Sequence, residues 1–66
     1  MQVWINGKQR ELADGARVLD ALTALGMPGT GVAVAVDGEV VPRVDWPGVV
    51  LSEDARVEVL TAVQGG

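Results

Sequence analysis

The stretch RVEVLTAVQGG, residues 56–66, alternates in side-chain character and then ends in two glycines. This period of two is typical of a β-strand with one covered face. One face of the predicted strand, residues 56–63, carries Val57, Val59, Thr61 and Val63, and the other carries Glu58, Leu60 and Ala62. We expect residues 64–66 to form a flexible tail with little to bury, so that the α-carboxylate of Gly66 becomes the candidate reactive group.

Two turn signals organise the strands that precede this stretch. Asn6-Gly7 separates the strand-like residues 2–5 and 8–12, and Asp37-Gly38 separates residues 31–36 from residues 39–41. Both dipeptides tolerate the positive φ angles of tight hairpin turns, so each predicts a β-hairpin. Pro42 ends the second hairpin. Residues 42–48 are predicted to be irregular, with Trp46 buried at one end of the core.

Residues 18–25, VLDALTAL, have the spacing of a short helix. Val18, Ala21, Leu22 and Leu25 recur at the intervals of one helical face. Gly26 stands where a helix takes its left-handed last residue, and Pro28 prevents continuation. Asp14 is the nearest side chain suited to cap the first turn. Packing onto a sheet must hold so short a helix.

The element order is strand, strand, helix, strand, short strand, strand. It predicts an α+β fold, a mixed sheet with one main helix packed across one face. The first and last strands can lie parallel at its centre, because the connection between them contains the helix. This is the β-grasp arrangement. We expect residues 1–63 to form this single domain.

The composition excludes several classes of function. The 66 residues include no Cys and no His, so a thiolate nucleophile, an imidazole base and the usual zinc ligands are absent. A net charge of −4 argues against binding to nucleic acid or to an anionic membrane. We find neither a signal peptide nor a membrane-spanning run, and we expect a cytoplasmic protein without a bound cofactor or metal.

The face of the sheet away from the helix is predicted to carry small or apolar side chains. Ala33, Ala35, Leu60 and Ala62 lie there, beside the predicted tail. Such a patch often marks a protein interface, although scattered exposed apolar residues are also common.

The two terminal glycines suit a carboxylate that must enter a narrow site. A carboxylate becomes an acylating group when it attacks the α-phosphate of ATP, and residues without side chains can thread a deep channel. The chain has no phosphate-binding glycine motif, so the ATP would be bound by another protein.

The chain resembles the ThiS family of sulfur carrier proteins in thiamine biosynthesis, within the ubiquitin-like β-grasp superfamily that also includes MoaD. The resemblance runs the full length and is strongest in MQVWINGK, in VAVAVDGEVVPRVDW and in VEVLTAVQGG. Asp37 departs from the family pattern, which usually has Asn in this turn, and Ala16 stands where Ser or Thr often caps the helix.

The resemblance implies a cycle in which the chain is a co-substrate and not an enzyme. A ThiF-like enzyme adenylates Gly66 with ATP, sulfur from a donor system converts the carboxylate to a thiocarboxylate, and a ThiG-like thiazole synthase takes the sulfur. The family's functional residues correspond to Gly65 and Gly66, with Gln64 in the same tail. Arg43, in the V-P-R motif, is either a partner contact or a solvated arginine.

Two alternatives stay open. A MoaD-like carrier would deliver its sulfur to a molybdopterin precursor. A passive β-grasp interaction module would use the apolar face formed by Ala33, Ala35, Leu60 and Ala62 and not the tail. A stand-alone enzyme is disfavoured, because the sequence shows no paired, pocketed carboxylates and so small a domain leaves little room for a deep cleft.

Overall fold

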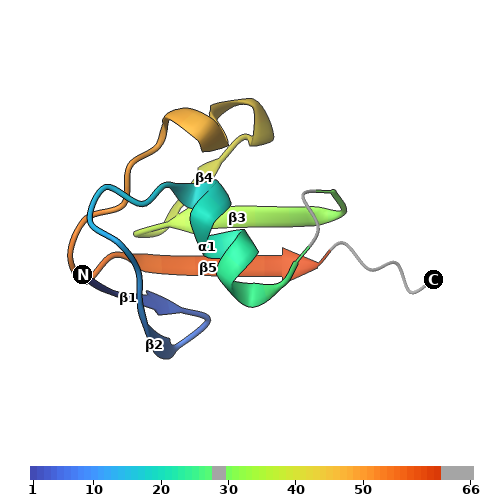
Figure 1. The fold of residues 1–66 in the computed structure, drawn as a ribbon. Helices are drawn as coiled ribbons and strands as arrows, with labels where there is room; N and C mark the ends of the chain where they lie inside the picture. Colours follow the sequence, from blue (N-terminus) through green and yellow to red (C-terminus); the bar gives the residue numbers. More distant parts are fainter. Residues whose placement is uncertain (28–29, 62–66) are drawn as a thin grey trace.

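The computed structural model describes residues 1–27 and 30–61, which form a five-stranded mixed sheet crossed by one α-helix (Figure 1). The strands are β1 (Gln2–Ile5), β2 (Lys8–Glu11), β3 (Val32–Val36), β4 (Glu39–Val41) and β5 (Arg56–Thr61). They lie in the order β2-β1-β5-β3-β4. β1 and β5 are parallel, and the other neighbours are antiparallel. The predicted fold class and the central placing of the last strand are confirmed.

Two strand boundaries differ from the prediction. β2 ends at Glu11, one residue before the predicted limit, and β3 begins at Val32. Both hairpin turns are confirmed by positive φ angles, which are 52° at Asn6 and 52° at Asp37, each followed by a glycine that also has positive φ. The turn residues therefore adopt the left-handed conformation that Asn, Asp and Gly tolerate best.

Helix α1 (Val18–Leu25) has the predicted bounds and the predicted C-terminus. Gly26 has a φ of 71°, its N–H donates to the Thr23 carbonyl, and the Met27 N–H donates to the Leu22 carbonyl. This pair of bonds satisfies the last carbonyls of the helix, and the positive φ explains the glycine.

The predicted N-terminal cap of α1 is wrong. Asp20, in the first turn, accepts a hydrogen bond from the Arg17 backbone N–H at 2.8 Å. Asp14 instead forms an ion pair with the Met1 amino group at 3.2 Å, beside a second pair with Glu11 at 3.1 Å. These carboxylates raise the pKa of the Met1 amino group, and Glu11 makes the larger contribution. Asp14 therefore pairs with the Met1 amino group, which the fold brings close to it, and does not cap the helix.

Residues 43–48, predicted to be irregular, form the short 3-10 helix η1 (Arg43–Gly48). Its Trp46 is 2% exposed, as predicted, and the indole Nε1–H donates to the Val41 carbonyl at 2.8 Å. The Leu51 N–H bonds the Ala16 carbonyl and thereby joins the following loop to the start of α1. η1 thus closes the core beside the helix.

The hydrophobic core lies between α1 and the sheet face that the helix covers. The sheet supplies mainly aliphatic residues that alternate along the strands, and η1 and the loop after it supply Trp46 and Leu51. The buried cluster comprises Val3, Ile5, Val18, Ala21, Leu22, Val34, Trp46, Leu51, Ala55, Val57 and Val59. No helix within residues 1–27 and 30–61 is long and apolar enough to cross a membrane.

Candidate functional site

The predicted reactive end follows the central strand of the sheet. β5 lies between β1 and β3 and is described as far as Thr61 (Figure 1). Gln64, Gly65 and Gly66, the predicted tail and reactive carboxylate, lie outside the described residues, as do Ala62 and the limit of the domain predicted at residue 63. The described part of the site is therefore the end of β5 and the surfaces around it.

The open face of the sheet brings together the predicted interface residues that the structure describes. Leu60 is 67% exposed and stands opposite Ala33 in the ladder between β5 and β3. Ala35, two residues along β3, stands opposite Glu58 on one side and opposite Val40 of β4 on the other. We call Leu60, Ala33, Ala35 and Val40 the open-face patch. It is an apolar surface on three neighbouring strands.

Val40 was not among the predicted interface residues, although it is 77% exposed. The sequence carried the signal, because Val40 and Val41 must point to opposite faces of the sheet. Val41 is half-buried and packs against the core, which leaves Val40 on the open face. The strand is only three residues long, which is too short to show its alternation clearly.

The same face also carries an aromatic and cationic pair that sequence reasoning missed. The guanidinium carbon of Arg56 lies 6.0 Å from the centre of the Trp4 ring, within the range of a cation–π interaction. Trp4 and Arg56 are paired positions of β1 and β5. Alternation with the buried Val3 and Ile5 places Trp4 on the open face, at the opposite end of β5 from Leu60.

Arg43 begins η1 and is exposed, just beyond the end of β4. It therefore lies outside the sheet that carries the open-face patch. Its predicted contact with a partner stays a prediction.

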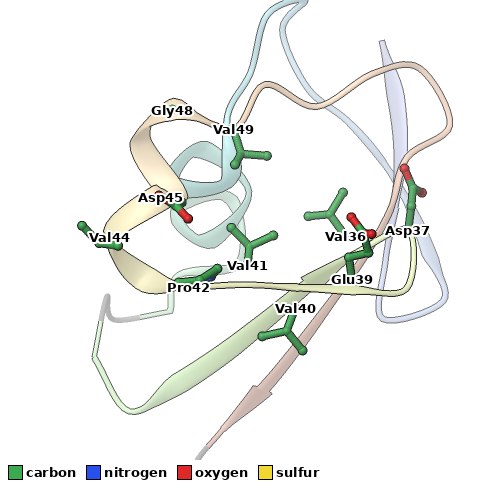
Figure 2. Close-up of a pocket in the computed structure, with 10 residues that line it drawn as sticks. All are labelled: Val36, Asp37, Glu39, Val40, Val41, Pro42, Val44, Asp45, Gly48 and Val49. Atoms are coloured by element: carbon green, nitrogen blue, oxygen red, sulfur yellow. The ribbon is translucent and has the colours of Figure 1, made fainter.

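A hollow of about 570 Å³ lies between β4 and η1 (Figure 2). Half-buried valines from β3, β4 and the residue after η1 form its apolar wall, namely Val36, Val41 and Val49. Among the described residues that line it, Asp37, Glu39 and Asp45 are acidic and none is basic. Figure 2 shows the Asp45 carboxylate directed from η1 toward the hollow. These negative charges oppose the binding of a nucleotide phosphate there.

The described residues offer no set of metal ligands. Within residues 1–27 and 30–61, no three side chains among His, Cys, Asp and Glu lie close enough together to hold a metal ion. The geometry supplies an apolar surface beside the central strand β5, which continues toward the C-terminal glycines. An exposed apolar surface of this kind is suited to binding another protein.

Comparison with known proteins identifies the chain's relatives. The model of the ThiS family matches residues 3–66. The crystal structure of the thiamine biosynthesis protein ThiS from Geobacter metallireducens superposes with a TM-score of 0.83 and 29% sequence identity, covering 100% of both chains. The solution structure of a thiamine biosynthesis protein from the same organism gives a TM-score of 0.80 and 29% identity, covering 100% of this chain and 88% of that one. Among curated proteins, none matches the chain significantly.

Proposed function

The chain belongs to the ThiS family, and from that membership we propose that it is a sulfur carrier protein for the thiazole moiety of thiamine. The observation that carries the proposal is the family match through residue 66, which includes the C-terminal Gly65-Gly66. Two solved structures named for thiamine biosynthesis share the whole fold and support it. In this role the chain is a co-substrate that works in the cytoplasm, and partner enzymes modify it.

The proposed chemistry occurs at the α-carboxylate of Gly66. A carboxylate oxygen attacks the α-phosphate of ATP, pyrophosphate leaves, and the product is an acyl-adenylate. Hydrosulfide supplied by a donor system then attacks the carbonyl carbon, the bond to AMP breaks as the carbon–sulfur bond forms, and the product is a thiocarboxylate. Its sulfur passes to a thiazole synthase of the ThiG type. The chain binds no cofactor in this scheme, because a ThiF-like partner holds the ATP.

The open-face patch is the proposed docking surface for the activating enzyme. Leu60 lies one residue before the last described residue of β5, so a partner that covers the patch is also close to the point where the chain continues toward Gly66. Apolar surface removed from water supplies affinity without requiring a particular charge on the partner. Ala62, the remaining predicted interface residue of this strand, stays part of the proposal.

Intact-mass measurement tests the proposal directly. The chain is incubated with ATP, a ThiF-like enzyme and a sulfur source, and we expect a gain of about 16 Da, because one sulfur replaces one oxygen. The matched control carries one extra residue after Gly66 and should show no gain, because the reactive carboxylate has become an internal amide. If the partner modifies its own carrier but not this chain, the proposed activation is wrong.

The acceptor is tested separately. With the thiocarboxylate form in hand, transfer of labelled sulfur to the product of thiazole synthase supports the thiamine assignment. Transfer to a molybdopterin precursor, without transfer to thiazole, would favour a MoaD-like role instead.

A further inference from the structure

The backbone of β5 continues past the end of its neighbour β1. β1 pairs with β5 through Trp4 and Ile5, and the Asn6 N–H still donates to the Val57 carbonyl at 2.9 Å. The chain then turns away at Asn6-Gly7 to form β2 (Figure 1). β1 therefore provides no further backbone groups to form the next hydrogen bonds of the parallel pairing, which would be made to the N–H and carbonyl of Val59.

The Asn6 side chain makes these two hydrogen bonds in place of the backbone. Its Oδ1 accepts a hydrogen bond from the Val59 N–H at 2.8 Å, and its Nδ2 donates to the Val59 carbonyl at 3.2 Å. A primary amide offers the same donor and acceptor as a peptide group. In a continuing parallel strand, successive peptide groups would make these two bonds, so the amide occupies the position of the missing backbone.

We propose that Asn6 is a positioning residue: its side-chain amide extends the sheet beyond β1 and fixes the segment of β5 from which the chain continues to Gly66. This inference rests on the proposed function. Val59 precedes Leu60 of the open-face patch and Thr61 at the end of β5. The two hydrogen bonds therefore hold the docking surface and the start of the C-terminal segment in one orientation before a partner binds.

The second hairpin shows why an amide is required at residue 6. Asp37 has the same φ of 52°, and its Oδ1 accepts from the Arg56 N–H at 2.9 Å. The bond to the Arg56 carbonyl comes from the Asp37 backbone N–H, at 2.7 Å. A carboxylate suffices at residue 37, because the side chain only accepts a hydrogen bond. At residue 6 the side chain must also donate, which a carboxylate cannot do.

Amide hydrogen exchange measured by NMR tests these contacts in the isolated chain. Asn6→Gly keeps a residue that tolerates the positive φ and removes the amide. We expect the protection of the Val59 N–H to fall by about tenfold more than that of the Val34 amide in the core, because Val59 loses a hydrogen bond of its own while Val34 reports only the change in global stability. Asp37→Asn is the matched control and should leave both amides unchanged, since its oxygen still accepts. Equal protection of Val59 in the wild type and in Asn6→Gly would overturn the inference.

Asn6→Asp adds a test that general destabilisation would not mimic. The introduced carboxylate can accept from the Val59 N–H, but its second oxygen faces the Val59 carbonyl, so the contact is repulsive at neutral pH. Protonation restores a donor. We expect the protection factor of Val59 to rise in this variant as pH falls from about 7 to about 3, through the range in which carboxyl groups titrate. The wild type, measured in parallel, should show no such rise, and a pH-independent value in the variant would contradict the proposal. This test also decides the question if Asn6→Gly does not fold.

The functional readout is the KM of a ThiF-like enzyme for the chain, measured by ATP-dependent adenylation. We expect Asn6→Gly to raise KM by about fivefold with kcat unchanged, because a loosened segment must be ordered on docking. Asp37→Asn should leave KM unchanged. If the wild type is not adenylated, the proposed function is wrong. If the wild type is adenylated and Asn6→Gly has the same KM, the positioning role is wrong and the function stands.

Discussion

The two faces of the sheet carry the same aliphatic residue types, but one face forms the core and the other is exposed. On the covered face, Val57 and Val59 are at most 4% exposed beneath α1. On the open face, Leu60 lies next to Val59 in the same strand and is 67% exposed. The difference shows that residue type alone does not define the core. Position in the alternation decides whether an aliphatic side chain stabilises the fold or stays available to a partner.

The largest effect expected from this comparison is a cavity beneath the helix. Leu22 is 2% exposed, so Leu22→Ala should lower the free energy of unfolding by about 3 kcal/mol, as buried leucine truncations do. Urea denaturation followed by circular dichroism measures the change. Leu19→Ala on the same helix is the matched control, since Leu19 is 41% exposed, and it should cost less than about 1 kcal/mol. Equal costs at the two positions would mean that the covered face is not the core.

The opposite expectation holds for the open face. Leu60→Glu should change the free energy of unfolding by less than about 0.5 kcal/mol, because the side chain is already in water. Binding to the ThiF-like enzyme should weaken by about tenfold, or about 1.4 kcal/mol, because a charge would then be buried in an apolar contact.

Val44→Glu is the matched control for Leu60→Glu. Val44 is 84% exposed but lies on η1, outside the open face, so the same substitution there should leave binding unchanged. Isothermal titration calorimetry distinguishes the two variants. A loss of affinity for both, or for neither, would remove the open-face patch from the docking model.

Among the losses that these experiments should detect, the smallest is the loss of stability expected on removing the Arg56 charge from the open face. Arg56→Gln removes the cation that lies over the Trp4 ring, and exposed pairs of this kind contribute about 0.5–1 kcal/mol. Thermal unfolding should detect a correspondingly small decrease in stability. A decrease as large as that of Leu22→Ala would show that the open face contributes to the core after all.

Much of the fold was predictable because its signals are local. The alternation around Val34 and Val57, the helical spacing of residues 18–25 and the two turn dipeptides each depend on neighbours within a few positions. Their bounds in the structure agree within one or two residues where the chain is described. The cap of α1 failed because Asp14 had two possible partners, and the choice between them depended on where Met1 lies in space.

The candidate site divides in the same way. The sequence indicated the glycine end and three open-face residues that the structure describes, Ala33, Ala35 and Leu60, from composition and alternation alone. It did not indicate that Val40 lies opposite Ala35, or that Arg56 lies against Trp4, because strand register is set by pairing across the whole sheet. Nor did it reveal the hollow beside η1, whose wall comes from separate segments of the chain.

By itself, the sequence determined the element order, the fold class and the family, since periodicity, turn chemistry and the family motif are all written along the chain. The tertiary structure alone decided which polar groups meet. Asn6 reads in sequence as a turn residue, and only the parallel pairing of β1 with β5 places its amide against Val59. The physical reason is that a hydrogen bond between residues this far apart in the chain requires the sheet to be assembled first.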